Sequence, residues 1–127
     1  MSEQRSILVV DDEPEIRKLV AAMLTRAGYR VFSADTGENA IRIFKSHPEM
    51  DLLLTDVVAP GMSGPMIADK IADLNPGIKV LFMSGYDGSQ VVQKYVVERG
   101  YSLLVKPFTM EQLESKVQAV LAKTAAP

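Results

Sequence analysis

The 127-residue chain contains no cysteine, and this absence removes several classes of chemistry. Disulfides, thiolate metal sites and thiol nucleophiles are all excluded. No apolar run approaches the roughly 20 residues that a membrane-spanning helix needs. The opening residues, Met-Ser-Glu-Gln-Arg, lack the apolar stretch of a secretion signal. We therefore expect no membrane segment and a cytoplasmic location.

The chain also lacks an excess of basic residues, since its formal net charge is −2. A nucleic-acid partner is not expected, because binding to a phosphate backbone usually requires clustered positive charge. Hydrophobic residues make up 47% of the chain and charged residues 24%, which is typical of a soluble globular protein. We see no internal repeat or linker. The sequence predicts one domain over residues 1–127, with a core from about 5 to 122 and short flexible termini.

Short apolar runs alternate with segments of helical spacing along the whole chain. The runs predict strands at residues 7–10, 30–34, 52–56, 80–83 and 103–105. Helices are expected from 14 to about 27, from about 37 to 47, from 64 to 74, from about 89 to 98, and after 109. Thr36 is a candidate N-cap, and Thr109 with Gln112 has the form of a capping box.

Five strands alternating with five helices predict an α/β fold with a parallel sheet covered on both faces. Right-handed crossovers favour a doubly wound (βα)5, flavodoxin-like arrangement with strand order 2-1-3-4-5. In this order the first and third strands are neighbours. Asp11 and Asp12 would then lie beside Asp56 at the carboxyl edge, where Ser84 and Lys106 also end strands.

This set of side chains suggests phosphoryl chemistry. Three carboxylates close together repel one another unless a cation lies among them, and oxygen ligands of this kind suit Mg²⁺. The ammonium of Lys106 and the hydroxyl of Ser84 could hold phosphoryl oxygens. A carboxylate can also act as the nucleophile and become an aspartyl phosphate, and Asp56 is the candidate.

Four motifs in this order resemble those of response-regulator receiver domains of two-component signalling. They are Val-Val-Asp-Asp-Glu at 9–13, Asp-Val-Val-Ala-Pro-Gly-Met-Ser-Gly at 56–64, Met-Ser-Gly at 83–85 and Lys-Pro-Phe at 106–108. The resemblance extends from residue 7 through the last helix. It implies a signalling phosphoacceptor, not an enzyme with a substrate of its own, although a parent protein could be a kinase.

The resemblance also implies roles for individual residues. Asp56 would accept a phosphoryl group from a histidine kinase, a histidine phosphotransfer protein or a small phosphodonor. Asp12, Asp56 and the backbone carbonyl of Val58 would bind Mg²⁺, with Asp11 acting through a water. Ser84 and Lys106 would hold the phosphoryl oxygens, and the bond from Lys106 to the following proline is typically cis in this family.

Some residues depart from the family pattern. Leu103 stands where an aromatic switch residue is usual, and Tyr101 lies two residues earlier. Ala59 replaces a commonly larger apolar residue. In this family the residues at the positions of Val58 and Tyr86 flank the phosphoryl site. Because both side chains are bulky and offer little to orient water, we expect a long-lived phosphoaspartate.

The sequence argues against two other functions and leaves a third open. A carrier of flavin mononucleotide would need a hydroxyl- and glycine-rich loop where this chain has Asp-Asp-Glu-Pro. A phosphatase with an aspartate nucleophile would need insertions that are absent. A receiver-like scaffold that works without phosphorylation stays open because of Leu103.

The biological setting also leaves alternatives. The chain could be a stand-alone receiver or the receiver segment of a bacterial hybrid histidine kinase. The chain as it stands leads us to expect no output module of its own, so signalling would change what binds the face formed by the fourth helix, fifth strand and fifth helix. Phosphorylation-dependent homodimerisation is a further expectation.

Overall fold

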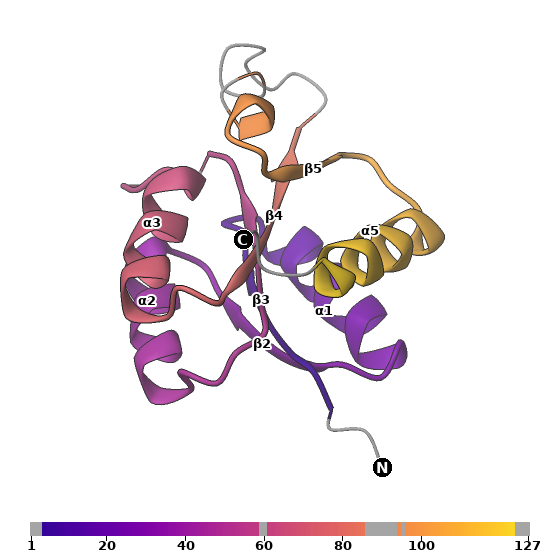
Figure 1. The fold of residues 1–127 in the computed structure, drawn as a ribbon. Helices are drawn as coiled ribbons and strands as arrows, with labels where there is room; N and C mark the ends of the chain where they lie inside the picture. Colours follow the sequence, from indigo (N-terminus) through magenta and orange to yellow (C-terminus); the bar gives the residue numbers. More distant parts are fainter. Residues whose placement is uncertain (1–3, 59–60, 86–93, 95, 124–127) are drawn as a thin grey trace.

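The structure, a computed structural model, describes residues 4–58, 61–85, 94 and 96–123. Five parallel strands form one sheet in the order β2-β1-β3-β4-β5 (Figure 1). The strands are β1 (Ser6–Val10), β2 (Arg30–Ala34), β3 (Leu52–Asp56), β4 (Lys79–Ser84) and β5 (Ser102–Val105). The predicted doubly wound fold and strand order are confirmed.

Four helices have complete bounds within the described residues: α1 (Pro14–Arg26), α2 (Gly37–Ser46), α3 (Gly64–Leu74) and α5 (Met110–Ala122). The helix predicted over about 89–98 falls largely outside these residues, although residues 94 and 96–98 are helical. No helix of the described chain is both long enough and apolar enough to cross a membrane.

Local sequence signals explain where the helices begin. The hydroxyl of Thr36 accepts the backbone N–H of Asn39 at 3.1 Å. Thr109 and Gln112 form the predicted capping box, in which each side chain accepts the other residue's backbone N–H. Such caps supply hydrogen-bond acceptors to N–H groups that the first helical turn leaves unpaired. The predicted starts of α2 and α5 are therefore confirmed.

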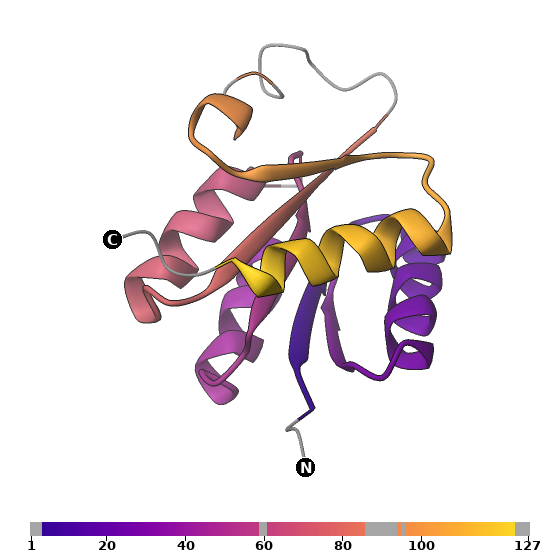
Figure 2. The same ribbon diagram turned by 45° about the vertical axis from the view of Figure 1, so that its right-hand side comes forward.

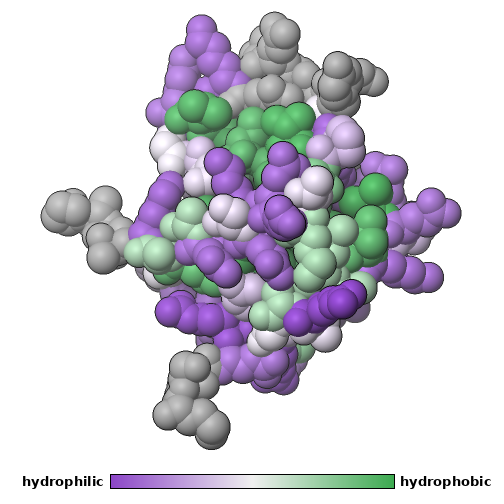
Figure 3. All heavy atoms as spheres, turned by 90° about the vertical axis from the view of Figure 1, so that its right-hand side faces the viewer, coloured by the Kyte–Doolittle hydropathy of each residue, from purple (hydrophilic) through white to green (hydrophobic). Residues whose placement is uncertain are grey.

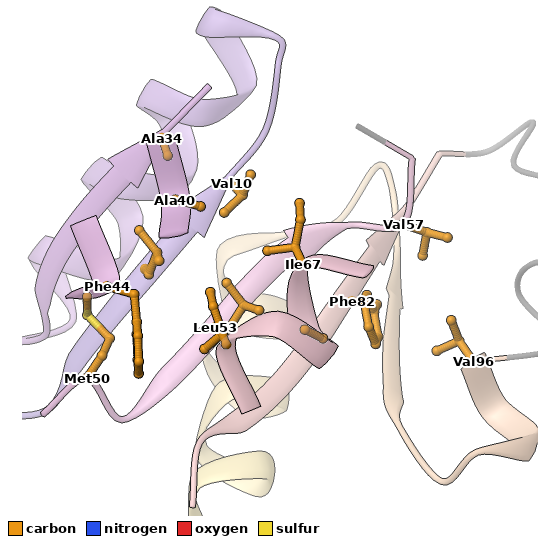
Figure 4. Close-up of a cluster of buried hydrophobic side chains, with 13 residues drawn as sticks. Val10, Ala34, Ala40, Phe44, Met50, Leu53, Val57, Ile67, Phe82 and Val96 are labelled. Carbon is orange, nitrogen blue, oxygen red and sulfur yellow. The ribbon is translucent and has the colours of Figure 1, made fainter. Parts of the chain in front are cut away.

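Helices cover both faces of the sheet, with α2 and α3 on one side and α1 and α5 on the other (Figures 1 and 2). Alternate strand residues face opposite sides, as the two-residue period of a strand requires. Leu8, Leu53 and Phe82 belong to the core on the α2 and α3 side, which Figure 4 shows in close-up. Leu52 and Leu54 belong to the core on the α1 and α5 side. Burial on both faces explains why β1 and β3 are almost continuously apolar.

Candidate functional site

The four strands β1, β3, β4 and β5 bring polar residues to one edge of the sheet. Asp11 follows β1, Asp56 ends β3, Ser84 ends β4 and Lys106 follows β5. Since the strands are parallel and paired in this spatial order, their carboxyl ends lie side by side. The topology thus joins residues that lie as many as 95 positions apart in the chain.

Lys106 joins two of the predicted carboxylates. Its Nζ donates to Asp11 Oδ2 at 2.7 Å and to Asp56 Oδ2 at 2.8 Å. The side chain of Asp11 is fully buried, while those of Lys106 and Asp56 are only 13% and 14% exposed. Short, charge-assisted contacts with little solvent are the strong kind. The lysine is therefore the cation that compensates both carboxylates.

The electrostatics of Lys106 follow from these contacts. Burial alone, the largest single influence, would lower the pKa of the ammonium. The hydrogen bonds to Asp11 and Asp56, together with the attraction of both negative charges, outweigh that effect, and the pKa of Lys106 is raised above its usual value. The group therefore carries its charge throughout the physiological range.

Backbone amides hold the other oxygen of each carboxylate. Asp11 Oδ1 accepts the N–H of Glu13 at 2.9 Å, and Asp56 Oδ1 accepts the N–H of Val58 at 3.1 Å. Each carboxylate thus has one oxygen on a loop amide and one on Lys106. This arrangement fixes the orientation of both groups before any ligand binds.

The third predicted carboxylate is placed differently. Asp12 is exposed, and within the described residues no three acidic, histidine or cysteine side chains are grouped closely enough to hold one metal ion. The expectation that three carboxylates converge is therefore met for Asp11 and Asp56 only. The physical reason is that the Asp11 side chain is buried against Lys106, whereas Asp12 lies at a bend of the chain and is exposed to solvent.

The donor set nevertheless suits a hard divalent cation. Asp11, Asp12 and Asp56 supply carboxylate oxygens, which Mg²⁺ prefers, and it commonly keeps several waters instead of a complete protein cage. Of these three residues, Asp12 is the one that solvent can reach freely. The residues thus fit the metal chemically, while the ligand set remains a prediction.

The remaining predicted residues lie around this centre. Ser84 is buried at the end of β4, and its hydroxyl is 3.4 Å from the carbonyl oxygen of Gly85. The side chain of Val58 is 64% exposed. Ala59 and Tyr86 lie outside the described residues, so the predictions that involve them stay predictions.

The aromatic residue near the expected switch has a defined partner. The ring of Tyr101 meets that of Phe82 edge to face, with their centroids 5.1 Å apart. Leu103 is partly buried and packs against the same core cluster. Whether Leu103 serves as the switch position remains a prediction.

Two further residues reach the site without having been given a role from the sequence. Arg17 Nη1 donates to the carbonyl oxygen of Asp11 at 2.8 Å. A Cβ at Gly64 would lie 2.3 Å from the carbonyl oxygen of Asp56. A signal existed for Arg17, since a basic residue six positions after Asp11 lies one helical turn beyond the acidic loop. Gly64 is the last residue of the motif at 56–64, but nothing in the sequence indicated its close approach to the Asp56 carbonyl.

Fold and site together define a class: doubly wound α/β proteins with two acidic residues and a lysine in contact at the carboxyl edge of a parallel sheet. Residues 7–118 match the sequence profile of the response regulator receiver domain. The chain belongs to this family, whose members act in two-component signalling. Phosphorylation and Mg²⁺ binding are typical of the family.

Individual relatives agree with this assignment. The sensor kinase CckA of Brucella abortus is 32% identical over 124 residues, covering 97% of this chain and 13% of CckA. The response regulator receiver protein CpdR of the same organism is 29% identical, covering 92% of this chain and 97% of CpdR. Among solved structures, the chemotaxis protein CheY4 of Vibrio cholerae has a TM-score of 0.82 at 27% identity, covering 93% of this chain and 99% of CheY4.

The relatives differ in how much of them the chain covers. It spans 13% of CckA and 31% of a cyclic di-GMP phosphodiesterase of Thermotoga maritima, but nearly all of CpdR. The same domain thus occurs in relatives that are nearly all receiver and in relatives that are many times longer.

Proposed function

We propose that this receiver domain accepts a phosphoryl group on Asp56 from the phosphohistidine of a histidine kinase or a histidine phosphotransfer protein. The observation that carries the proposal is the contact of Lys106 Nζ with both Asp11 and Asp56. A largely buried carboxylate held beside an ammonium is placed to react while its charge is compensated.

The reaction needs little covalent chemistry from the protein. An oxygen of Asp56 attacks phosphorus, a P–O bond forms, the P–N bond to the donor imidazole breaks, and the imidazole leaves with the bonding pair and takes up a proton. Lys106 stabilises negative charge on the phosphoryl oxygens, and the Ser84 hydroxyl donates a hydrogen bond to one of them. Positioning and charge compensation account for most catalysis of phosphoryl transfer.

Asp11, Asp12, Asp56 and the backbone carbonyl of Val58 would hold Mg²⁺ in this proposal, with Asp11 acting through a water. The cation supplies charge neutralisation for the transferring group. The two loop amides that bind Asp11 Oδ1 and Asp56 Oδ1 keep these carboxylates oriented for both tasks.

The test is incubation with Mg²⁺ and acetyl phosphate followed by intact-mass measurement. We expect one added phosphoryl group on the wild type and none on Asp56→Asn. Asp69→Asn is the matched control, because it removes one exposed carboxylate from α3 and should be modified like the wild type. Modification of Asp56→Asn at the wild-type rate would place the nucleophile elsewhere.

A wild type that stays unmodified with Mg²⁺ and several donors would favour a scaffold that works without phosphorylation. Leu103 is the observation that keeps this second function under consideration, because it is an aliphatic, partly buried residue at the expected switch position. The mass experiment separates the two functions directly.

We further propose that phosphorylation changes binding of a downstream protein at the face that includes β5 and α5. A groove at this face is lined by residues of β5 and of the first turns of α5, among them Val105, Thr109 and Lys116. The side of the molecule covered by α1 and α5 is largely hydrophilic, with hydrophobic side chains gathered in its upper part (Figure 3). Phosphorylation-dependent homodimerisation through this face is part of the same proposal.

The cellular setting follows the relatives. CpdR is a receiver over nearly its whole length, and CckA is a sensor kinase many times longer than this chain. We propose a bacterial cytoplasmic phosphorelay in which the domain acts either alone or as the receiver part of a hybrid histidine kinase. The partner kinase must present a phosphohistidine.

A further inference from the structure

Arg17 connects α1 with the acidic loop that precedes it. Its Nη1 donates to the carbonyl oxygen of Asp11 at 2.8 Å, while its backbone N–H donates to the carbonyl oxygen of Glu13 at 2.9 Å. The side chain is partly buried. One residue thus contacts both ends of the three-residue segment 11–13, which lies between β1 and α1.

The bond to the Asp11 carbonyl also constrains Asp12. The carbonyl of Asp11 and the N–H and Cα of Asp12 share one planar peptide unit. Fixing the carbonyl direction therefore fixes the point from which the Asp12 side chain leaves the backbone. A hydrogen bond from a guanidinium is stronger than a neutral one, so this constraint is substantial.

Local structure gives the loop few other constraints. Pro14 opens α1 without an N–H, and Glu13, the N-cap, makes no side-chain cap. Among the residues that the structure describes, the remaining backbone contacts of the loop are the Asp11 N–H to the carbonyl of Ala34 at 3.2 Å and the Glu13 N–H to Asp11 Oδ1 at 2.9 Å. Neither of these contacts involves the peptide unit between Asp11 and Asp12.

The charge of Arg17 also interacts with a nearby carboxylate, that of Asp35. Asp35 follows β2 and accepts a hydrogen bond from Asn39 Nδ2 at 2.6 Å. That bond is the main cause of the lowered pKa of Asp35, and the charge of Arg17 contributes in the same direction. The guanidinium is therefore attracted from both the acidic loop and the end of β2.

We propose that Arg17 is a positioning residue that sets the exposed Asp12 carboxylate for binding a divalent cation. The inference rests on the proposed function, since it takes Asp12 as a ligand. Without Arg17, the peptide unit between Asp11 and Asp12 is ordered only when the cation binds. The affinity for the cation falls because binding then has to supply this ordering. Residues that orient metal ligands typically contribute tenfold or more to affinity.

The sign of the effect separates this role from simple electrostatics. Removing a positive charge near a cation site should strengthen cation binding by Coulomb attraction. A positioning role predicts the opposite. Lys18→Met is the matched control, because it removes the same charge from the adjacent, exposed position of α1.

The experiment is titration calorimetry of Mg²⁺ into the wild type, Arg17→Met, Arg17→Gln and Lys18→Met. We expect the dissociation constant to rise about tenfold in both Arg17 variants and to change less than twofold in Lys18→Met. Amide spectra of the metal-free proteins should show a shifted Asp12 signal in the Arg17 variants only. The rate with acetyl phosphate should recover to within about twofold at saturating Mg²⁺, because the reacting groups are unchanged.

Equal or tighter Mg²⁺ binding by Arg17→Met and Arg17→Gln, with the wild type binding normally, would overturn the inference and leave the proposed function intact. A wild type that neither binds Mg²⁺ nor accepts a phosphoryl group would overturn both. Arg17→Lys keeps a charge and a donor, so we expect it to restore affinity to within about threefold of the wild type. A Lys variant as weak as Arg17→Met would contradict the role of the hydrogen bond.

Discussion

Gly64 at the start of α3 lies against the backbone of the proposed phosphoacceptor. A Cβ at this position would meet the carbonyl oxygen of Asp56 at 2.3 Å and Val57 Cα at 3.0 Å. The Gly64 N–H also donates to the carbonyl of Val57 at 2.7 Å, which keeps the two segments together. The alanine variant Gly64→Ala must therefore push α3 and the end of β3 apart by about 1 Å to reach ordinary contact.

The size of the effect follows from two opposed terms. Overpacking against backbone typically costs about 1–3 kcal/mol. Alanine recovers about 0.5–1 kcal/mol of helix propensity relative to glycine, and less at a helix start. The steric term is larger, so we expect a net loss of about 1–2 kcal/mol in the free energy of unfolding. For a chain of this size that loss lowers Tm by about 4–8 °C.

The functional effect should be larger than the loss of stability suggests. A displacement of about 1 Å at a reacting group can reduce a rate about a hundredfold. Since α3 can share the movement with β3, we expect phosphorylation of Gly64→Ala by acetyl phosphate to slow by at least about tenfold.

Gly37→Ala is the matched control. Gly37 is the first residue of α2 as Gly64 is of α3, and both are buried. The three atoms nearest to its Cβ would all belong to side chains, with Ile67 Cγ1 and Met62 Sδ at 3.0 Å. Side chains give way more easily than backbone, so we expect a stability change within about 1 kcal/mol and a phosphorylation rate within about threefold of the wild type.

The assays are thermal unfolding followed by circular dichroism and the initial rate of phosphoryl incorporation by intact mass. Both are measured on the wild type and the two alanine variants. If Gly64→Ala unfolds at the wild-type Tm and is phosphorylated at the wild-type rate, the close approach to Asp56 has no energetic consequence and the reasoning fails.

Two further predictions concern the site itself. Phosphoaspartate on the wild type should last well beyond seconds with Mg²⁺ present, because Val58 offers no group to orient water; decay followed by intact mass within seconds would contradict this. Lys106→Met leaves the fully buried Asp11 charge uncompensated, and urea unfolding at pH 8 should show a loss of about 3 kcal/mol. The pKa of Lys106 is raised in the folded state, so the stability that its charge contributes is complete below the unfolded pKa of about 10.4 and is lost as pH rises through the folded pKa. The difference in free energy of unfolding between the wild type and Lys106→Met should therefore narrow above the unfolded pKa. A difference that stays constant up to about pH 11 would refute the assignment.

Much of the fold was predictable because local and global signals agree. Leu52–Asp56 is a strand in both the prediction and the structure, since three buried leucines and a following Pro-Gly pair leave few alternatives. The cap at Thr36 and the cis bond between Lys106 and Pro107 also match. The order of the four motifs along the chain was sufficient to predict the family.

Features that depend on contact between distant segments were not predictable. Sequence order places Asp11, Asp12 and Asp56 near one edge, but it does not say that Asp11 is fully buried while Asp12 is exposed. That difference depends on which side chain Lys106 reaches after β5 has paired with β4. The approach of Gly64 to the Asp56 carbonyl depends similarly on how closely α3 packs against the end of β3.

The charge balance of the site indicates that a single lysine would not suffice for the proposed phosphorylated state. Asp11 and Asp56 carry two negative charges and Lys106 one positive charge, so the contact group is negative by one charge. A phosphoryl group on Asp56 replaces a carboxylate by a group of about −1.5 to −2 charges, and the imbalance grows next to a buried aspartate. In the proposed function, a divalent cation held by oxygen ligands would restore the balance, and Asp12 is an exposed carboxylate that does not contact Lys106. An exposed Asp12 is therefore consistent with the proposed function, in which the charge of the site changes on phosphorylation.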